Sequence, residues 1–369
     1  MVKQLILQLT PTRRLFLIIM VSASPFFALM SGAKSTPAPM ASLNLVNTLA
    51  DAPDANLGDS VCDSDGATSG SQCTLRAAIQ EANAAAGDDT ITFDPSISGD
   101  ISLASALPDL NSNLSINGPG ASILTVQRST AGGTPNFRIF NIPIGITVSI
   151  SGLTLRNGRV DNDGGAICNS GTLTLTNSVL RNNTADSGGA IISVGGSSLN
   201  ISRTSISQNT TIGGSAAGIL SQGTFTMMDS TISGNTVSGG LFIGGGSTII
   251  ANCTISNNSG QSGGAGVLVT GGITTATIVN STITGNRVDP TGITGAIGGG
   301  LIRLDGNVHL RNTIVAGNFR GVGSLADDVS GNVNPSSAFN LIGVGGSGGL
   351  TDGGKQQGWD CRSRSGSTR

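Results

Sequence analysis

Residues 230–258 read STISGNTVSGGLFIGGGSTIIANCTISNN, and the six-residue pattern that decides the fold occurs twice in this stretch. Each copy is a six-residue piece with Ile at its third position and Asn at its last, followed by polar residues, Gly-Gly and a short apolar run. Outward from this stretch the piece recurs, sometimes with Leu or Val for Ile, and it ends at Asn183, Asn209, Asn235, Asn258, Asn286 and Asn318. An internal repeat of about 25 residues therefore organises the chain from about residue 150 onward.

The pieces between the Asn residues have the composition of β-strands. Stretches such as TLTLTNSVL (172–180) are rich in β-branched residues and alternate apolar with polar side chains, which argues against a helical repeat. One unit cannot bury its own apolar side chains, but equivalent strands of successive units can stack in parallel and share one core. The sequence therefore predicts an all-β chain whose residues 95–354 form a right-handed parallel β-helix, a solenoid of about 25-residue coils.

This fold accounts for an unusual composition, in which Gly supplies 56 of 369 residues, aromatic residues make up 3% and Tyr is absent. Gly suits the corners of the coils, where a positive φ is needed, and small β-branched residues suit a narrow core. Six Asn residues at one phase of the repeat predict a ladder in which stacked side chains share amide hydrogen bonds. An earlier copy at 152–158 has Gly158 in the place of the Asn. For any single Asn, an ordinary turn position is the alternative.

Charge and histidine content exclude several classes of function. Lys and Arg number 19 against 21 Asp and Glu, and this balance, with few aromatic residues, argues against a nucleic-acid partner. His309 is the single His, so neither a His-based triad nor a His metal site can form. The calcium-loop fragments at 63–66 and 161–164 lack a bidentate acid at the needed distance. We therefore expect no cofactor and no bound metal.

The first 33 residues are predicted to be an export signal and no part of the fold. Three basic residues precede an apolar run over residues 15–30, and the small residues Ser31 and Ala33 follow it, as in a secretory signal peptide. A transmembrane helix is the alternative, but the run contains Pro25 and falls short of a full bilayer span. The general secretory route and the twin-arginine route both fit. We expect an exported protein, extracellular or on the outer surface of a bacterium, with no transmembrane span in the mature chain.

Residues 34–94 are predicted to form an N-terminal cap region with one helix over residues 74–86. Thr74 is a suitable N-cap and Gly87 a suitable stop. Four apolar residues fall on one face at helical spacing, namely Leu75, Ala78, Ile79 and Ala82. An open solenoid end exposes unpaired strand edges, so we expect this helix to cap it.

Because the chain is predicted to be exported, its cysteines are expected to lie in an oxidising compartment, where disulfides form. Cys62 and Cys73 lie in one short loop, VCDSDGATSGSQC, and predict a disulfide. Cys168 and Cys253 lie inside the repeat, where we expect small buried residues.

The segment from Leu45 to Asp94 resembles the CSLREA domain of exported bacterial β-helix proteins. The resemblance rests on Val46-Asn-Thr, the cysteine loop, CTLRAAIQEAN (73–83) and the following DTITF, with Thr74 for Ser and Ala77 for Glu. The later Gly-Gly-Ala-Ile units are similar to the repeats of chlamydia-type polymorphic outer membrane proteins, with Ile, Leu or Val where that family has Phe. This resemblance, over about residues 44–350, implies a β-helix passenger outside the cell with a role in adhesion or surface structure. It implies no catalytic residue.

The sequence thus predicts a non-enzymatic exported or cell-surface β-helix protein that is adhesin-like or surface-structural. Its partner is an unknown surface or extracellular molecule, with a polysaccharide as one candidate. The alternative is a polysaccharide lyase or glycoside hydrolase of the pectate-lyase-like type, which needs acidic residues on neighbouring coils. Asp163 and Asp186 precede successive Gly-Gly pairs and are the weak catalytic candidates, although both equally fit solvated loop positions.

Residues 355–369 differ in composition from the rest of the chain, with four basic residues, the sole Trp and an unpaired Cys361. One choice of codons for Trp359–Arg369, read one base later, encodes Gly-Thr-Ala-Asp-Pro-Gly-Leu-Asp-Pro-Leu, which is more like the rest of the protein. Our hypothesis for this anomalous tail is a frameshift or a fragmentary gene model.

Overall fold

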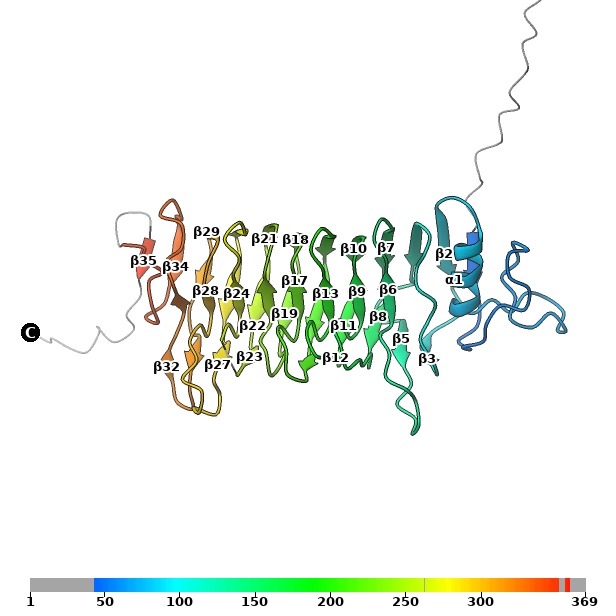
Figure 1. Cartoon of the computed structure of the whole chain (residues 1–369), viewed down its shortest axis with the longest axis horizontal. Coiled ribbons are helices and arrows are strands. Elements are labelled where there is room, and N and C mark those ends of the chain that lie inside the picture. The colour runs from blue at the N-terminus through cyan, green and yellow to red at the C-terminus, as the bar shows by residue number, and fades with distance from the viewer. Residues whose placement is uncertain (1–42, 262, 352–355, 359–369) are drawn as a thin grey trace, which may run out of the picture. The chain divides into compact units, whose positions relative to one another are not determined.

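The computed structural model describes residues 43–261, 263–351 and 356–358, and these form a parallel β-solenoid (Figure 1). The predicted signal peptide lies outside the described residues, and so does the anomalous tail apart from residues 356–358. Apart from one antiparallel pair, the paired strands run parallel, and each strand pairs with its equivalent one coil away. The parallel β-helix predicted from the repeat is therefore confirmed.

Three long sheets make up the walls of the solenoid, and the first has ten strands. These strands are β1 (Leu43–Val46), β2 (Asp89–Phe93), β4 (Leu114–Asn117), β7 (Thr147–Ser151), β10 (Thr172–Thr176), β14 (Ser198–Ser202), β18 (Thr224–Met228), β21 (Ser247–Ala251), β25 (Thr275–Val279) and β29 (Asn307–Arg311). Because β1 and β2 already belong to this sheet, the stacking reaches into the segment that the sequence assigns to the cap region.

The second long sheet has eleven strands. They are β3 (Gly99–Leu103), β5 (Leu124–Arg128), β8 (Thr154–Arg156), β11 (Val179–Arg181), β15 (Ser205–Ser207), β19 (Thr231–Ser233), β22 (Thr254–Ser256), β26 (Thr282–Thr284), β30 (Ile314–Val315), β34 (Asn340–Ile342) and β35 (Gln356–Gly358). From β3 to β30, each follows a strand of the ten-stranded sheet around one corner of the coil.

The third long sheet has eight strands, and two small sheets lie in the loops that precede it. The eight strands are β6 (Phe140–Ile142), β9 (Ile167–Asn169), β13 (Ile191–Ser193), β17 (Ile219–Ser221), β20 (Leu241–Ile243), β24 (Val267–Val269), β28 (Leu301–Arg303) and β33 (Val329–Ser330). The small sheets pair β12 (Thr184–Ala185) with β16 (Thr210–Thr211), and join β23 (Ser259–Gly260), β27 (Arg287–Val288), β31 (Phe319–Arg320) and β32 (Leu325–Ala326).

Strand residues alternate between the core and the surface, as their polar-apolar alternation requires. In β10, Leu173 and Leu175 are fully buried while the threonines between and beside them are half-buried on the outer side. The inward side chains of all three long sheets form one continuous apolar cluster. Figure 1 shows the coils side by side from cyan to orange, each contributing one layer to that cluster.

A single helix, α1 (Leu75–Ala84), forms within the described residues where the sequence predicts one, and it ends two residues before the predicted end. The Thr74 side chain accepts a hydrogen bond from the Ala77 N–H at 3.0 Å, so Thr74 is the N-cap. The four residues of the predicted apolar face are all fully buried in the solenoid core cluster. The helix therefore closes the core beside β1 and β2.

The six repeat Asn residues form a ladder of side chains that are at most 1% exposed. In each step the backbone N–H and the Nδ2 group of one Asn both donate to Oδ1 of the Asn one coil later, over 2.9–3.1 Å. The other Nδ2 hydrogen goes to a strand carbonyl of the preceding coil, as from Asn235 to Ile206 at 3.0 Å. Each buried amide thus has a partner for both of its donors and for its acceptor.

The ladder has a defined beginning and end. It begins at Gly158, whose N–H donates to Asn183 Oδ1 at 2.9 Å. It ends at Asp328, whose Oδ1 accepts both the N–H and the Nδ2 of Asn318, at 2.8 and 3.0 Å. The remaining Asp328 oxygen accepts the Gly345 N–H at 3.1 Å. A carboxylate suits this last position because it accepts without leaving a further donor to satisfy.

The residue before each ladder Asn has a left-handed backbone conformation, with φ between +55° and +71°. These residues are Asn182, Gln208, Gly234, Asn257, Gly285 and Gly317. Gly and Asn adopt this conformation at low cost, which explains the fifth letter of the repeat piece.

A second buried row begins each repeat piece. Its hydroxyl side chains accept a backbone N–H from the previous coil, as Ser230 does from Thr204 at 3.1 Å and Ser281 from Cys253 at 3.1 Å. Cys253 occupies one position of this row, and its thiol faces the carbonyls of its own and the neighbouring coil. Cys253 is therefore buried as expected, whereas Cys168 is half-buried on the outer side of β9 and corrects the expectation of a buried residue.

The ladder predicts a large penalty for Asn235→Ala. The change leaves the backbone N–H of Asn209 and one Nδ2 hydrogen of Asn209 without their acceptor and removes a donor from the carbonyl of Ile206, which we expect to destabilise the protein by about 3 kcal/mol or more. Urea unfolding followed by circular dichroism measures the loss. Asn200→Ala on the outer side of β14 is the matched control and should change stability by less than about 0.5 kcal/mol. Equal effects of the two changes would contradict the ladder's role.

Cys253 is predicted to be unreactive in the folded protein. Burial raises the pKa of its thiol to about 11, so at pH 8 only about one thiol in a thousand is the reactive thiolate. We expect iodoacetamide to leave Cys253 unmodified at pH 8 and to modify it after denaturation in guanidinium, as measured by peptide mass spectrometry. Modification of the folded protein at the rate of an exposed thiol would contradict this prediction.

Candidate functional site

The polar residues of α1 tie the cap region to the first coils. Arg76 is 8% exposed, and its Nε donates to Asp51 Oδ1 at 2.8 Å in an ion pair. Its Nη1 and Nη2 donate to the carbonyls of Ala106 and Ser105, at 2.6 and 2.9 Å. The second Asp51 oxygen accepts the Ala104 N–H. Arg76 therefore fixes the loop that follows β3.

Two further polar residues of α1 each hold a different segment. The buried Glu81 carboxylate accepts the N–H groups of Gly58 and Ser60, at 2.6 and 3.0 Å. Asn83 donates from Nδ2 to the Asp109 carbonyl at 2.7 Å and accepts the Asn111 N–H at 2.8 Å. The motif predicted as a capping helix is thus also an anchor for loops on both of its sides.

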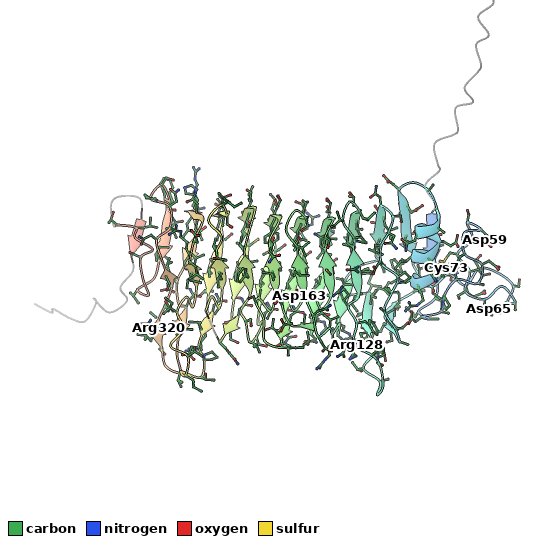
Figure 2. All side chains as sticks on the ribbon, in the orientation of Figure 1. Asp59, Asp65, Cys73, Arg128, Asp163 and Arg320 are labelled. Carbon is green, nitrogen blue, oxygen red and sulfur yellow. A yellow bond between two sulfur atoms is a disulfide. The ribbon has the colours of Figure 1, made fainter. Side chains whose placement is uncertain are left out.

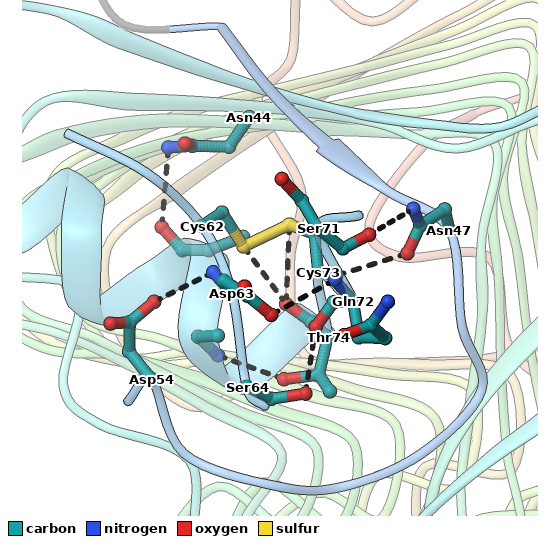
Figure 3. Close-up of a disulfide and its surroundings, with 12 residues drawn as sticks. Asn44, Asn47, Asp54, Cys62, Asp63, Ser64, Ser71, Gln72, Cys73 and Thr74 are labelled. Carbon is teal, nitrogen blue, oxygen red and sulfur yellow. Dashed lines mark hydrogen bonds between the residues drawn. A yellow bond between two sulfur atoms is a disulfide. The ribbon is translucent and has the colours of Figure 1, made fainter. Parts of the chain in front are cut away.

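The predicted disulfide between Cys62 and Cys73 is present, with its Cα atoms 5.0 Å apart (Figure 3). Figure 3 shows Asn47 beside it, where Asn47 accepts the Cys73 N–H at 2.9 Å and donates to the Ser71 carbonyl at 2.8 Å. The acidic fragment at 63–66 folds into turns, in which Asp63 accepts the N–H of Asp65 and of Gln72. These carboxylates therefore organise their own loop.

A cavity of about 500 Å³ opens beside β6, the edge strand of the eight-stranded sheet. We call it the junction cavity. Its walls come from the loop at 106–109, from residues 136–141 at and before β6, and from residues 160–162 in the next coil. Because Arg76 and Asn83 hold the first of these segments, α1 positions one wall of the cavity.

Arg138 is the central cation of the junction cavity. Its Nη2 donates to Asn162 Oδ1 at 2.9 Å and to the Asp163 carbonyl at 3.0 Å, and its Nη1 donates to Asn141 Oδ1 at 3.3 Å. Its Nε is enclosed and has no partner among the described residues. Within the part of the chain that the structure describes, no carboxylate lies within ion-pair distance of this guanidinium.

Two exposed carboxylates complete the lining of the cavity, those of Asp109 and Asp161. Asn136 donates to both oxygens of Asp161, at 3.2 and 3.4 Å. Arg128 donates to Asn136 at 3.5 Å, and burial together with the charge of Arg159 lowers the pKa of the Arg128 guanidinium. The junction cavity is therefore surrounded by charged and amide groups that include both hydrogen-bond donors and hydrogen-bond acceptors.

The catalytic candidates Asp163 and Asp186 lie in stacked turns but outside the cavity lining. Asp163 belongs to the turn between β8 and β9 (Figure 2), and the Asp186 N–H donates to the Asn162 carbonyl at 2.7 Å.

Sequence reasoning missed Arg138, Asp109 and Asp161 as a group. They come from three segments at different phases of the chain, so no periodic signal places them together. His309 lies on the outer side of β29 and accepts or donates one hydrogen bond with Ser336.

The outer side of the ten-stranded sheet carries three straight columns of side chains that, apart from Met228, are short and polar. In the registered strands β7, β10, β14 and β18 the columns read Thr147–Thr172–Ser198–Thr224, Ser149–Thr174–Asn200–Thr226 and Ser151–Thr176–Ser202–Met228. We call this surface the hydroxyl face. Within the described residues, Ser151 is the one member whose side chain has a hydrogen bond to the protein, so the other polar side chains remain open to solvent.

Comparison with known proteins agrees with this architecture. Residues 215–343 match the family model described as "Right handed beta helix region", which confirms the predicted right-handed β-helix. Among solved structures, "Geobacillus virus E2 - ORF18" matches at 12% identity and a TM-score of 0.27, over 70% of this chain and 55% of that one. The chain thus spans about half the length of that structure. None of the curated proteins compared matches the chain.

Arg76→Ala is predicted to loosen the cap region from the solenoid. It leaves Asp51 buried without its cation and two loop carbonyls without their donor, for an expected loss of about 3–5 kcal/mol. Thermal unfolding and limited proteolysis measure the effect, and we expect new cleavage within residues 51–72. Arg181→Ala, on the outer side of β11, is the matched control and should change neither the thermal unfolding temperature nor the cleavage pattern. Identical proteolysis patterns for wild type and Arg76→Ala would contradict the role of this clamp.

Proposed function

We propose that this chain is a non-enzymatic exported β-helix protein that acts outside the cell or on its outer surface as an adhesin-like or surface-structural protein. The hydroxyl face carries the proposal. Parallel stacking spaces the successive members of each column about 4.8 Å apart, so an extended polar partner meets a regular series of free hydroxyl and amide groups. A polysaccharide chain, which is itself a series of hydroxyl groups, fits such a surface.

The resemblance to the CSLREA domain and to polymorphic outer membrane protein repeats supports the same proposal, since those chains are passengers outside the cell. The disulfide between Cys62 and Cys73 suits an oxidising extracellular compartment. Among the residues that the structure describes, none forms a helix with the length and hydropathy of a membrane span.

A polysaccharide lyase or glycoside hydrolase is the second candidate, and one observation favours it. Asp109 and Asp161 line the same cavity as Arg138, and paired carboxylates are the groups that glycoside hydrolysis uses. In this alternative the catalytic residues come from the junction cavity, and Asp163 and Asp186 lie outside its lining.

Binding to a panel of acidic and neutral polysaccharides tests the proposal. We expect wild type to be retained on at least one polysaccharide, and Thr174→Glu/Thr226→Glu to lose retention because the new carboxylates interrupt the hydroxyl face. Thr231→Glu/Thr254→Glu, on the outer side of β19 and β22, is the matched control and should bind like wild type.

Three outcomes would count against the proposal. Retention on no member of the panel contradicts the adhesive role, and equal retention of both double variants contradicts the role of the hydroxyl face. Release of reducing ends or unsaturated products, lost in Asp109→Ala or Asp161→Ala, contradicts the non-enzymatic function. N-terminal sequencing of the secreted protein checks export, with a mature chain expected to begin near residue 34.

A further inference from the structure

We propose that the junction cavity binds one or two neutral sugar residues of an oligosaccharide. This inference rests on the proposed function, because it takes the partner to be a polysaccharide, but it concerns a different surface. The cavity volume of about 500 Å³ falls within the range of small-molecule sites in proteins. The hydroxyl face belongs to the ten-stranded sheet and the junction cavity lies beside the eight-stranded sheet, so the two surfaces would contact different parts of a polysaccharide.

The lining offers both hydrogen-bond donors and acceptors, which is what a sugar hydroxyl requires. Asn136 and Asn141 provide amides, and Asp109 and Asp161 provide acceptors that are exposed and retain free lone pairs. A hydroxyl group donates to a carboxylate and accepts from an amide at the same time. Apolar side chains from Leu107 and Val160 also line the cavity and can contact the C–H groups of a sugar ring.

The same lining disfavours an acidic sugar. A uronate carboxylate is best bound by the two-pronged fork of a free guanidinium. Arg138 has already committed Nη2 to two protein oxygens and Nη1 to a third. The carboxylates of Asp109 and Asp161 would in addition repel an anionic ligand.

The cavity is also held in shape before any ligand arrives. The wall at 106–109 is fixed at one end by the Arg76 bond to the Ala106 carbonyl and at the other by the Asn83 bond to the Asp109 carbonyl. Arg138 joins the opposite wall to the next coil through Asn162 and Asp163. A preformed site loses less free energy in ordering when a ligand binds.

Calorimetric titration with oligosaccharides of two to four residues tests this inference on the full chain. The panel contains neutral gluco-, manno-, galacto- and xylo-oligosaccharides and an oligogalacturonate of equal length. We expect at least one neutral oligosaccharide to bind and the oligogalacturonate to bind at least about tenfold more weakly. Asp109→Asn/Asp161→Asn removes two charged acceptors with little change of shape, and should weaken the neutral ligand by about tenfold or more. Asp305→Asn, at a surface turn far along the chain, is the control and should have no effect.

Each result separates this inference from the proposed function. Wild type that binds a polymer but none of the neutral oligosaccharides overturns the inference and leaves the adhesive role standing. Tighter binding of the oligogalacturonate, or unchanged binding by Asp109→Asn/Asp161→Asn, also overturns it. Oligosaccharide binding that is lost in Asp109→Asn/Asp161→Asn and kept in Thr174→Glu/Thr226→Glu supports the cavity independently of the hydroxyl face.

Discussion

The rest of the structure depends on a requirement of the ladder: a buried amide must find partners for its two donor hydrogens and for its acceptor oxygen, and here the neighbouring coils supply them. Asn meets this requirement with a side chain short enough to stay at the corner, and an ionised Asp in the middle of the row would lack a donor. Each coil therefore completes the hydrogen bonds of the coil before it. Steps of 26, 26, 23, 28 and 32 residues keep the same contact, so changes in coil length are absorbed by the loops. The row thus holds successive coils in one phase from Gly158 to Asp328.

Features that repeat could be predicted from the sequence for the same reason. The strands, the ladder residues and the narrow core all leave a periodic signal, and the helix and the short cysteine loop are local patterns. Contacts between residues at non-equivalent positions of the repeat leave no periodic signal in the sequence. Asp328 ends the ladder only ten positions after Asn318, because an antiparallel turn at β31 and β32 shortens the last step. Cys253 could be expected to be buried, but its place in a hydroxyl row appears only when the coils are stacked.

The cap region shows how one motif can satisfy two requirements. The apolar residues of α1 give the helical spacing that predicts it, and they close the core. The polar residues between them have no periodic reason to be Arg, Glu and Asn, yet each holds a loop that would otherwise be free. Arg76 contacts a carbonyl 30 positions away, a distance over which sequence pattern carries no information about contact. The clamp is therefore visible only in three dimensions.

The junction cavity lies where the repeat begins, and the reason is physical. Along the outer side of the eight-stranded sheet, later coils carry apolar side chains such as Ile192 and Leu220, which a neighbouring loop residue, Ala216, covers. At β6, the edge strand of that sheet, the outward residue is the polar Asn141, and the lining comes from the loop at 106–109 and from residues 160–162 of the next coil. Within a repeat, each coil packs against a coil on either side, and this packing limits which side chains each position can carry. Only where one neighbour is missing can charged residues gather around an open space, so the end of the solenoid is where this fold is free to carry a specific site.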